Sequence, residues 1–163
     1  MLPFEIQTAV DYKTHIVDEE YAEFKKREKH LLSAYRLAQA LFHLRDWTFN
    51  QYAGTPTFRF SSSGKDYQKY LEDQCDKFGY IRDIANAVKH AELDPKMRPS
   101  TTMSSLANTG VSPGAFSRAF SDAFQNRGPI ITHIPGLPPI YFAEAADKVK
   151  AMWDRLFVEH GWK

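Results

Sequence analysis

Cysteine is nearly absent from this sequence, since Cys75 is the single one among 163 residues. A lone cysteine excludes an intrachain disulfide, and it excludes the cysteine-rich zinc sites whose ligands recur at short spacings. The six histidines form no HxxxH or HxH pair either, so we expect no metal site and no cofactor. Such low cysteine use fits a reducing compartment, and we therefore expect a cytoplasmic protein.

Long apolar runs and an excess of one charge sign are also missing. No stretch approaches the roughly 18 apolar residues of a membrane span, and the first residues lack the basic start and apolar run of a secretory signal. The 21 basic and 20 acidic residues leave a net charge of +1, which gives no global attraction to nucleic acid. A role in RNA binding would therefore need a local basic patch.

Aromatic and aliphatic residues are plentiful by contrast. Hydrophobic residues make up 43% of the chain and aromatic residues 14%, enough to fill the core of one domain spanning residues 1–163. Apolar residues recur at helical spacing in four segments, which we expect to be helices over about residues 4–24, 28–51, 64–93 and 142–160. In the second segment they cover about half of the helix circumference, so that helix should pack against two or more partners.

Turn-forming residues gather in one region, because residues 95–140 hold most of the nine prolines and half of the eight glycines. The run PIITHI at 129–134 predicts a short strand, and a small hairpin is the expected outcome. The phenylalanines around residues 115–125 follow helical spacing, although a strand stays possible there. The sequence thus predicts a mainly α fold, a four-helix up-and-down bundle with a small β-hairpin and loop insertion before the last helix.

The stretch YIRDIANAVKH in the third predicted helix carries the candidate site residues, namely Arg82, Asp83, Asn86, Lys89 and His90. Arg82, Asn86 and His90 recur every four residues on the polar side of that helix. A histidine that titrates near neutral pH can accept the proton of a ribose 2′-OH, and an arginine can stabilise the charge that develops on the phosphorane. The pattern therefore predicts metal-free RNA chemistry, with the alternative of a solvated helix face whose last turn favours a cation.

Arg45 is a further candidate because it falls within the apolar arc of the second predicted helix, where a buried guanidinium needs an anion. Asp46, Asp83 or a carboxylate of the first helix would serve, and a link to Asp83 would orient Arg82. The alternative is that Arg45 extends its charged head into water. His43 and Asp46, three residues apart, would form either a base with its orienting carboxylate or a solvated pair.

An arginine followed by a polar residue and then a histidine, on a core helix of a four-helix bundle, resembles the HEPN superfamily. Arg82, Asp83 and His90 carry this resemblance, which covers mainly residues 28–93. It implies a ribonuclease or an RNA- or nucleotide-binding module of bacterial defence, in which two such helices face each other across a homodimer. Seven residues separate Arg82 from His90, which is more than the family usually has.

A second resemblance spans most of the chain. The runs LFHLRDW (41–47), FGYIRDIANAVKH (78–90) and MWDRLFVEHGW (152–162) are similar to a family of small bacterial proteins with no assigned activity. Two functional hypotheses follow from the whole sequence. One is a HEPN-like domain that binds or cleaves RNA, and the other is a non-enzymatic module that captures a protein partner through residues 95–140.

Overall fold

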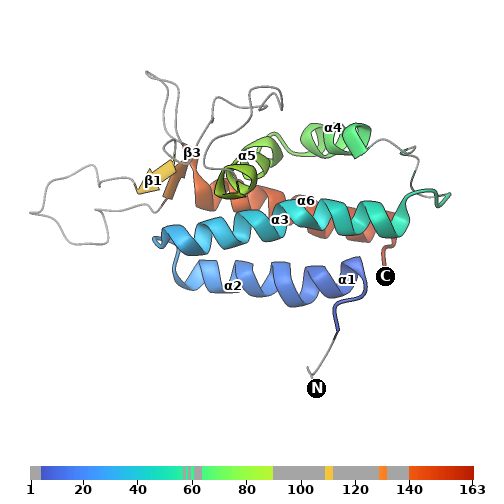
Figure 1. The fold of residues 1–163 in the computed structure, drawn as a ribbon, viewed down its shortest axis with the longest axis horizontal. Coiled ribbons are helices and arrows are strands. Elements are labelled where there is room, and N and C mark those ends of the chain that lie inside the picture. Colours follow the sequence, from blue (N-terminus) through green and yellow to red (C-terminus); the bar gives the residue numbers. More distant parts are fainter. Residues whose placement is uncertain are drawn as a thin grey trace, which may run out of the picture.

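Two long helices, α3 (Leu31–Tyr52) and α6 (Phe142–His160), run through the centre of the computed structural model (Figure 1). The structure describes residues 5–56, 58, 60, 64–89, 109–111, 129–131 and 140–163. Shorter helices precede and separate them: α1 (Ala9–Tyr12), α2 (Asp18–Lys26), α4 (Gly64–Gln74) and α5 (Phe78–Lys89). The fold is mainly α, as the sequence predicted.

The first helical segment is continuous but contains a wide π-helical turn, η1 (Lys13–Val17), between α1 and α2. It begins with a capping box, in which the Thr8 hydroxyl accepts from the Asp11 amide at 3.0 Å and the Asp11 carboxylate accepts from the Thr8 amide at 2.9 Å. The wide turn changes the phase of the helix, so that Ala9 and Val17 both point into the core. Lys13, which interrupts the apolar pattern, is the residue at which this turn begins.

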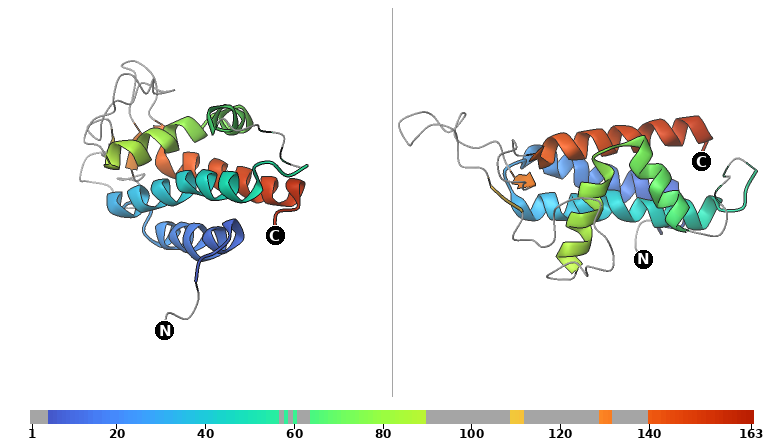
Figure 2. Two further views of the ribbon diagram at one scale, coloured as in Figure 1. Left: turned by 45° about the vertical axis from the view of Figure 1, so that its right-hand side comes forward. Right: turned by 90° about the horizontal axis from the view of Figure 1, so that it is seen from above.

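The third predicted helix, expected over 64–93, is in fact two helices. Cys75, Asp76 and Lys77 form a turn between α4 and α5, and the two helices meet at a sharp bend (Figure 2, right). Leu71 of α4 and Phe78 of α5, on the two sides of the bend, are both fully buried.

Helix α3 packs against the α1–α2 segment, α5 and α6, so the prediction that it has several partners is confirmed (Figures 1 and 2). Its buried positions cover two adjacent faces. They are Ser33, Ala34, Leu37, Ala38, Ala40, Leu41, Phe42, Leu44 and Thr48.

A small antiparallel sheet lies before α6. Its order is β1 (Thr109–Val111), β2 (Pro129–Ile131) and β3 (Ile140–Tyr141), with Gly110 opposite Ile130. The strand predicted at 129–134 is present over the described residues 129–131, and its antiparallel pairing agrees with the predicted hairpin. Strand β3 leads directly into α6. Residues 115–125, for which a helix and a strand both stay possible, lie outside the described residues.

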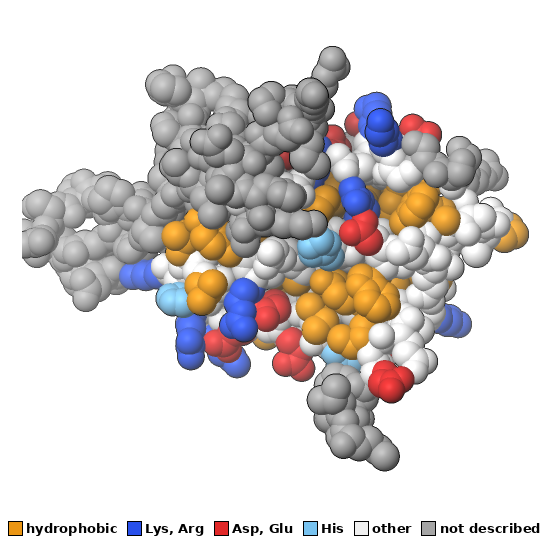
Figure 3. Space-filling model, viewed as in Figure 1, with side chains coloured by type: hydrophobic (Ala, Val, Ile, Leu, Met, Phe, Trp, Pro, Cys, Tyr) orange, Lys and Arg blue, Asp and Glu red, His pale blue; other side chains and the backbone are white. Residues whose placement is uncertain are grey.

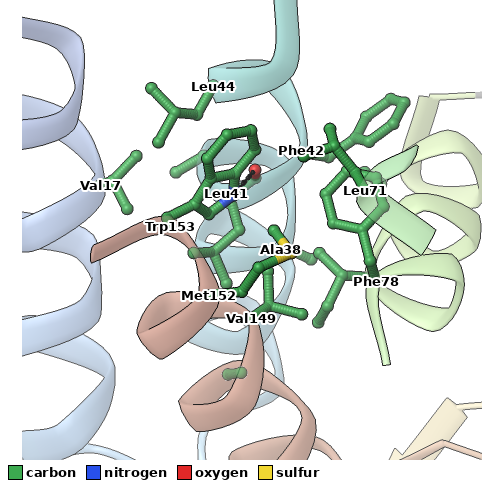
Figure 4. Close-up of a cluster of buried hydrophobic side chains, with 14 of the residues drawn as sticks. Val17, Ala38, Leu41, Phe42, Leu44, Leu71, Phe78, Val149, Met152 and Trp153 are labelled. Carbon is green, nitrogen blue, oxygen red and sulfur yellow. Dashed lines mark hydrogen bonds between the residues drawn. The ribbon is translucent and has the colours of Figure 1, made fainter. Parts of the chain in front are cut away.

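Trp153 of α6 lies at the centre of the core, with Leu41, Met152 and Phe78 around it (Figure 4). The indole is fully buried, and its Nε1–H donates a hydrogen bond of 3.0 Å to the Leu41 carbonyl oxygen of α3. The Phe78 ring of α5 meets the indole edge-on at a centroid distance of 6.1 Å. One side chain therefore joins three helices.

Helix α6 ends at Gly161, whose φ of 62° and ψ of 31° are left-handed. A Cβ at this position would contact nothing within 4 Å, so Gly161→Ala adds backbone strain alone. We expect a loss of about 1 kcal/mol in the free energy of unfolding, measured by urea denaturation. Gly64→Ala is the matched control, since a Cβ there also meets open space and φ is ordinary. Equal stability of the two variants would contradict the prediction.

Candidate functional site

Arg82 and Asp83 lie inside the protein rather than on a solvated helix face. Their exposed fractions are 7% and 1%. The sequence placed both residues on the polar side of α5, where either an open cleft or bulk water was expected. The structure corrects that expectation for this stretch, because α4 folds back beside α5 and places Glu72 against the guanidinium.

The Arg82 guanidinium is held between two carboxylates. Its Nε donates to Asp83 Oδ1 at 2.8 Å, and its Nη1 donates to Glu72 Oε1. Its Nη2 lies 2.7 Å from the same Asp83 oxygen as an ion pair, without the alignment of a hydrogen bond. Two negative charges thus surround one positive charge, so Arg82 presents no surplus positive charge in this arrangement.

This ion pair is one end of a polar chain that crosses three helices. Glu72 Oε1 also accepts from Gln68 Nε2 at 3.1 Å, and Gln68 Oε1 accepts from Arg45 Nη1 at 2.6 Å. Arg45 in turn donates from Nε and Nη2 to Asp46 Oδ1, at 3.0 and 2.6 Å. We call this set of side chains the polar network; it contains Arg82, Asp83, Glu72, Gln68, Arg45, Asp46 and His43.

Arg45 has the anion that the sequence required of it, and the anion is Asp46. The direct link from Arg45 to Asp83 that was also considered does not form; the two ends are joined through Gln68 and Glu72 instead. The Arg45 guanidinium also lies 4.7 Å from the centroid of the Phe42 ring, a cation–π contact. Arg45 is therefore fixed on two sides.

His43 forms the surface end of the polar network. Its Nδ1 lies 3.4 Å from Asp46 Oδ2, and the ring is exposed. Burial alone would raise the pKa of Asp46, but the hydrogen bonds from His43 and Arg45 outweigh that effect and hold the pKa below its usual value. Asp46 is thus an ionised carboxylate beside the His43 ring. The two side chains are 47% (His43) and 43% (Asp46) exposed, as in the solvated pair, and a role of His43 as a base stays a prediction.

Of the other three candidate residues of this stretch, the structure describes Asn86 and Lys89 but not His90. Asn86 is half-buried one turn beyond Arg82, and Lys89 is the last residue of α5. His90 lies outside the described residues, so its pairing with Arg82 stays a prediction.

Glu72 and Gln68 are site residues that sequence reasoning missed. In a single straight helix residue 72 would lie about 15 Å along the axis from residue 82, too far for contact. Their spacing at i and i+4 on a polar face was visible, but only the bend at residues 75–77 brings them to Arg82.

None of the described helices has both the length and the apolar character to cross a bilayer. Within the described part of the chain, no three His, Cys, Asp or Glu side chains converge as a metal ion would require. No protein-family profile matches the chain, and neither characterised proteins nor solved structures show a significant similarity to it.

Proposed function

We propose that this chain is a HEPN-like RNA-binding domain, with metal-independent RNA cleavage as its activity, and that it uses the polar side of α5. The observation that supports the proposal is the buried ion pair of Arg82 within the polar network. A buried ion pair seldom stabilises a fold more than apolar packing would. Buried charges with specific partners are concentrated at functional sites, which favours a role beyond packing.

Arg82 needs to exchange one partner in order to bind a phosphate. Its two carboxylates differ in exposure, since the Glu72 side chain is 26% exposed and the Asp83 side chain 2%. An incoming phosphate would therefore displace Glu72, while Asp83 stays as the anchor of the guanidinium. Asn86 would orient the nucleotide, and His90 would take the proton of the 2′-OH as the general base.

The proposal includes the arrangement of the helices. We take the α1–α2 segment, α3, the α4–α5 pair and α6 as the four arms of a HEPN-like up-and-down bundle. In the proposed dimer, two α5 helices face each other. Displacement of Glu72 by the phosphate would free part of the Arg82 guanidinium in each copy.

The decisive experiment measures cleavage of a labelled single-stranded RNA in the presence of EDTA. We expect His90→Ala to lower the rate by about two to four orders of magnitude, the usual contribution of a general base. The wild-type rate should rise with pH through the titration of histidine, since the neutral imidazole accepts the proton.

His15→Ala is the matched control, because His15 lies in η1 of the first helical segment and not on α4 or α5. It should leave the rate unchanged. If the wild-type protein neither binds nor cuts RNA, the proposal is wrong. A protein-interaction module that uses residues 95–140 would then be the better hypothesis.

A further inference from the structure

A surface hollow of about 350 Å³ lies where the chain before α1 meets the second half of α3. Its lining residues are Gln7, Asp46, Trp47, Asn50 and Gln51. Asp46 belongs to the polar network as well, so the hollow adjoins the outer end of the network that holds Arg82. We call it the Trp47 hollow.

One wall of the Trp47 hollow is a rigid aromatic stack. The half-buried Trp47 indole stacks on the Tyr12 ring, with a centroid distance of 5.2 Å and an angle of 20°. Burial, together with the charges of Asp46 and Glu20, raises the pKa of Tyr12 to about 12, so its phenol is neutral at physiological pH. Figure 3 shows hydrophobic side chains gathered on this face, where the N-terminal helices meet α3.

The other walls carry amide groups. Gln51 Oε1 accepts from the Ala9 amide at 2.6 Å, which fixes that side chain and leaves its NH₂ group as a donor. The exposed Asn50 side chain makes no hydrogen bond with the described residues, so its donor and its acceptor are both available. Gln7 adds a third amide to the lining.

Charge in the Trp47 hollow is largely compensated. The single carboxylate of the lining, Asp46, has Oδ1 bound by Arg45 and Oδ2 next to His43. A ligand that enters the hollow would therefore meet an aromatic wall and paired donors and acceptors rather than a strong field of either sign. This chemistry suits a neutral, flat, hydrogen-bonding group.

We propose that the Trp47 hollow binds one unpaired nucleobase of an RNA strand, and that adenine fits it best. Proteins recognise single-stranded RNA by stacking unpaired bases on aromatic side chains and by hydrogen bonds to the base edges. Asparagine and glutamine amides match the donor and acceptor pattern of adenine. This inference rests on the proposed RNA function, and it adds the site that would select the nucleotide.

Binding can be measured in two ways. Trp153 and Trp162 are 0% and 6% exposed, so a change of tryptophan fluorescence on addition of adenosine would report mainly on Trp47. Anisotropy of a labelled oligoadenylate then measures strand binding. We expect Trp47→Ala to weaken oligoadenylate binding about tenfold or more, since the strand loses one stacked base.

Matched variants separate recognition from damage to the fold. Trp47→Phe keeps an aromatic ring and should retain most of the affinity. Asn50→Ala should reduce the preference for oligoadenylate over oligouridylate. Val158→Ala, at an exposed position of α6, is the neutral control. Circular dichroism checks that each variant is folded.

The outcomes distinguish this inference from the proposed function. If oligoadenylate binds wild-type protein and Trp47→Ala equally well, the nucleobase site is wrong while RNA binding stands. If adenosine quenches Trp47 but no RNA binds, the site is supported and the RNA function is overturned. If neither adenosine nor RNA binds, both are overturned.

Discussion

Arg82→Ala should lower the free energy of unfolding by about 3–5 kcal/mol, as expected when one partner of a buried ion pair is removed. The substitution leaves Glu72 and Asp83 close together without the guanidinium that now separates them. Asp83 is almost fully buried, so water cannot replace the lost positive charge. Urea denaturation followed by circular dichroism at pH 7 measures the effect.

Arg155→Ala provides the control for Arg82→Ala. Arg155 forms an exposed ion pair with Glu159 at 3.2 Å and donates an exposed hydrogen bond of 3.0 Å to Gln74 Oε1, so its removal should cost no more than about 1 kcal/mol. The deficit of Arg82→Ala should also shrink as the pH falls toward 4. Without the guanidinium the two carboxylates bind protons more readily in the folded state than in the unfolded state, so lower pH favours folding. A small and pH-independent loss would contradict this account of the polar network.

The same reasoning decides how mutants should be used to test function. Loss of RNA cleavage in Arg82→Ala would not distinguish a phosphate-binding role from simple unfolding. His90→Ala is the cleaner test of chemistry, and Arg82→Lys keeps a charge at the site while removing the bidentate guanidinium geometry. If Arg82→Lys is folded but inactive, a role of the guanidinium in phosphate binding is favoured over a purely structural one.

Helix α6 shows what could be predicted from the sequence. Its range of 142–160 was predicted in full, because an uninterrupted apolar stripe is followed by a glycine. The start of α3 was predicted three residues too early, at 28 instead of 31. The charged residues before it are compatible with helix, but there the chain forms a turn that joins α2 to α3.

The bend between α4 and α5 shows what could not be predicted. Residues 75–77 contain neither glycine nor proline, so no local signal marks the break. Apolar residues also continue at helical spacing across the break, since Leu71 and Phe78 are seven residues apart, so the pattern predicts one continuous helix. The error then extended to the site, since a straight helix kept Glu72 away from Arg82 and left Arg82 and Asp83 facing outward.

The partners of Arg45 could be predicted only in part. Its place in an apolar arc correctly predicted that it needs an anion, and Asp46 was among the three candidates. The sequence did not decide between them, because the choice depends on which helices pack against α3. It also gave no sign that Gln68 would carry the connection onward to Glu72.

Trp153→Ala should cost about 3–5 kcal/mol, the usual penalty for truncating a buried tryptophan. The indole fills the space between α3, α5 and α6, and its N–H is bound to the Leu41 carbonyl oxygen (Figure 4). Trp153→Phe keeps an aromatic ring but lacks the N–H donor, so it should lose less stability than Trp153→Ala. About 1 kcal/mol of that loss should come from the missing hydrogen bond. Both losses should be the same at pH 4 and pH 7, because no ionisable group changes its partner. A Trp153→Ala deficit that shrinks at low pH, as that of Arg82→Ala should, would mean that the core and the polar network do not contribute separately to stability.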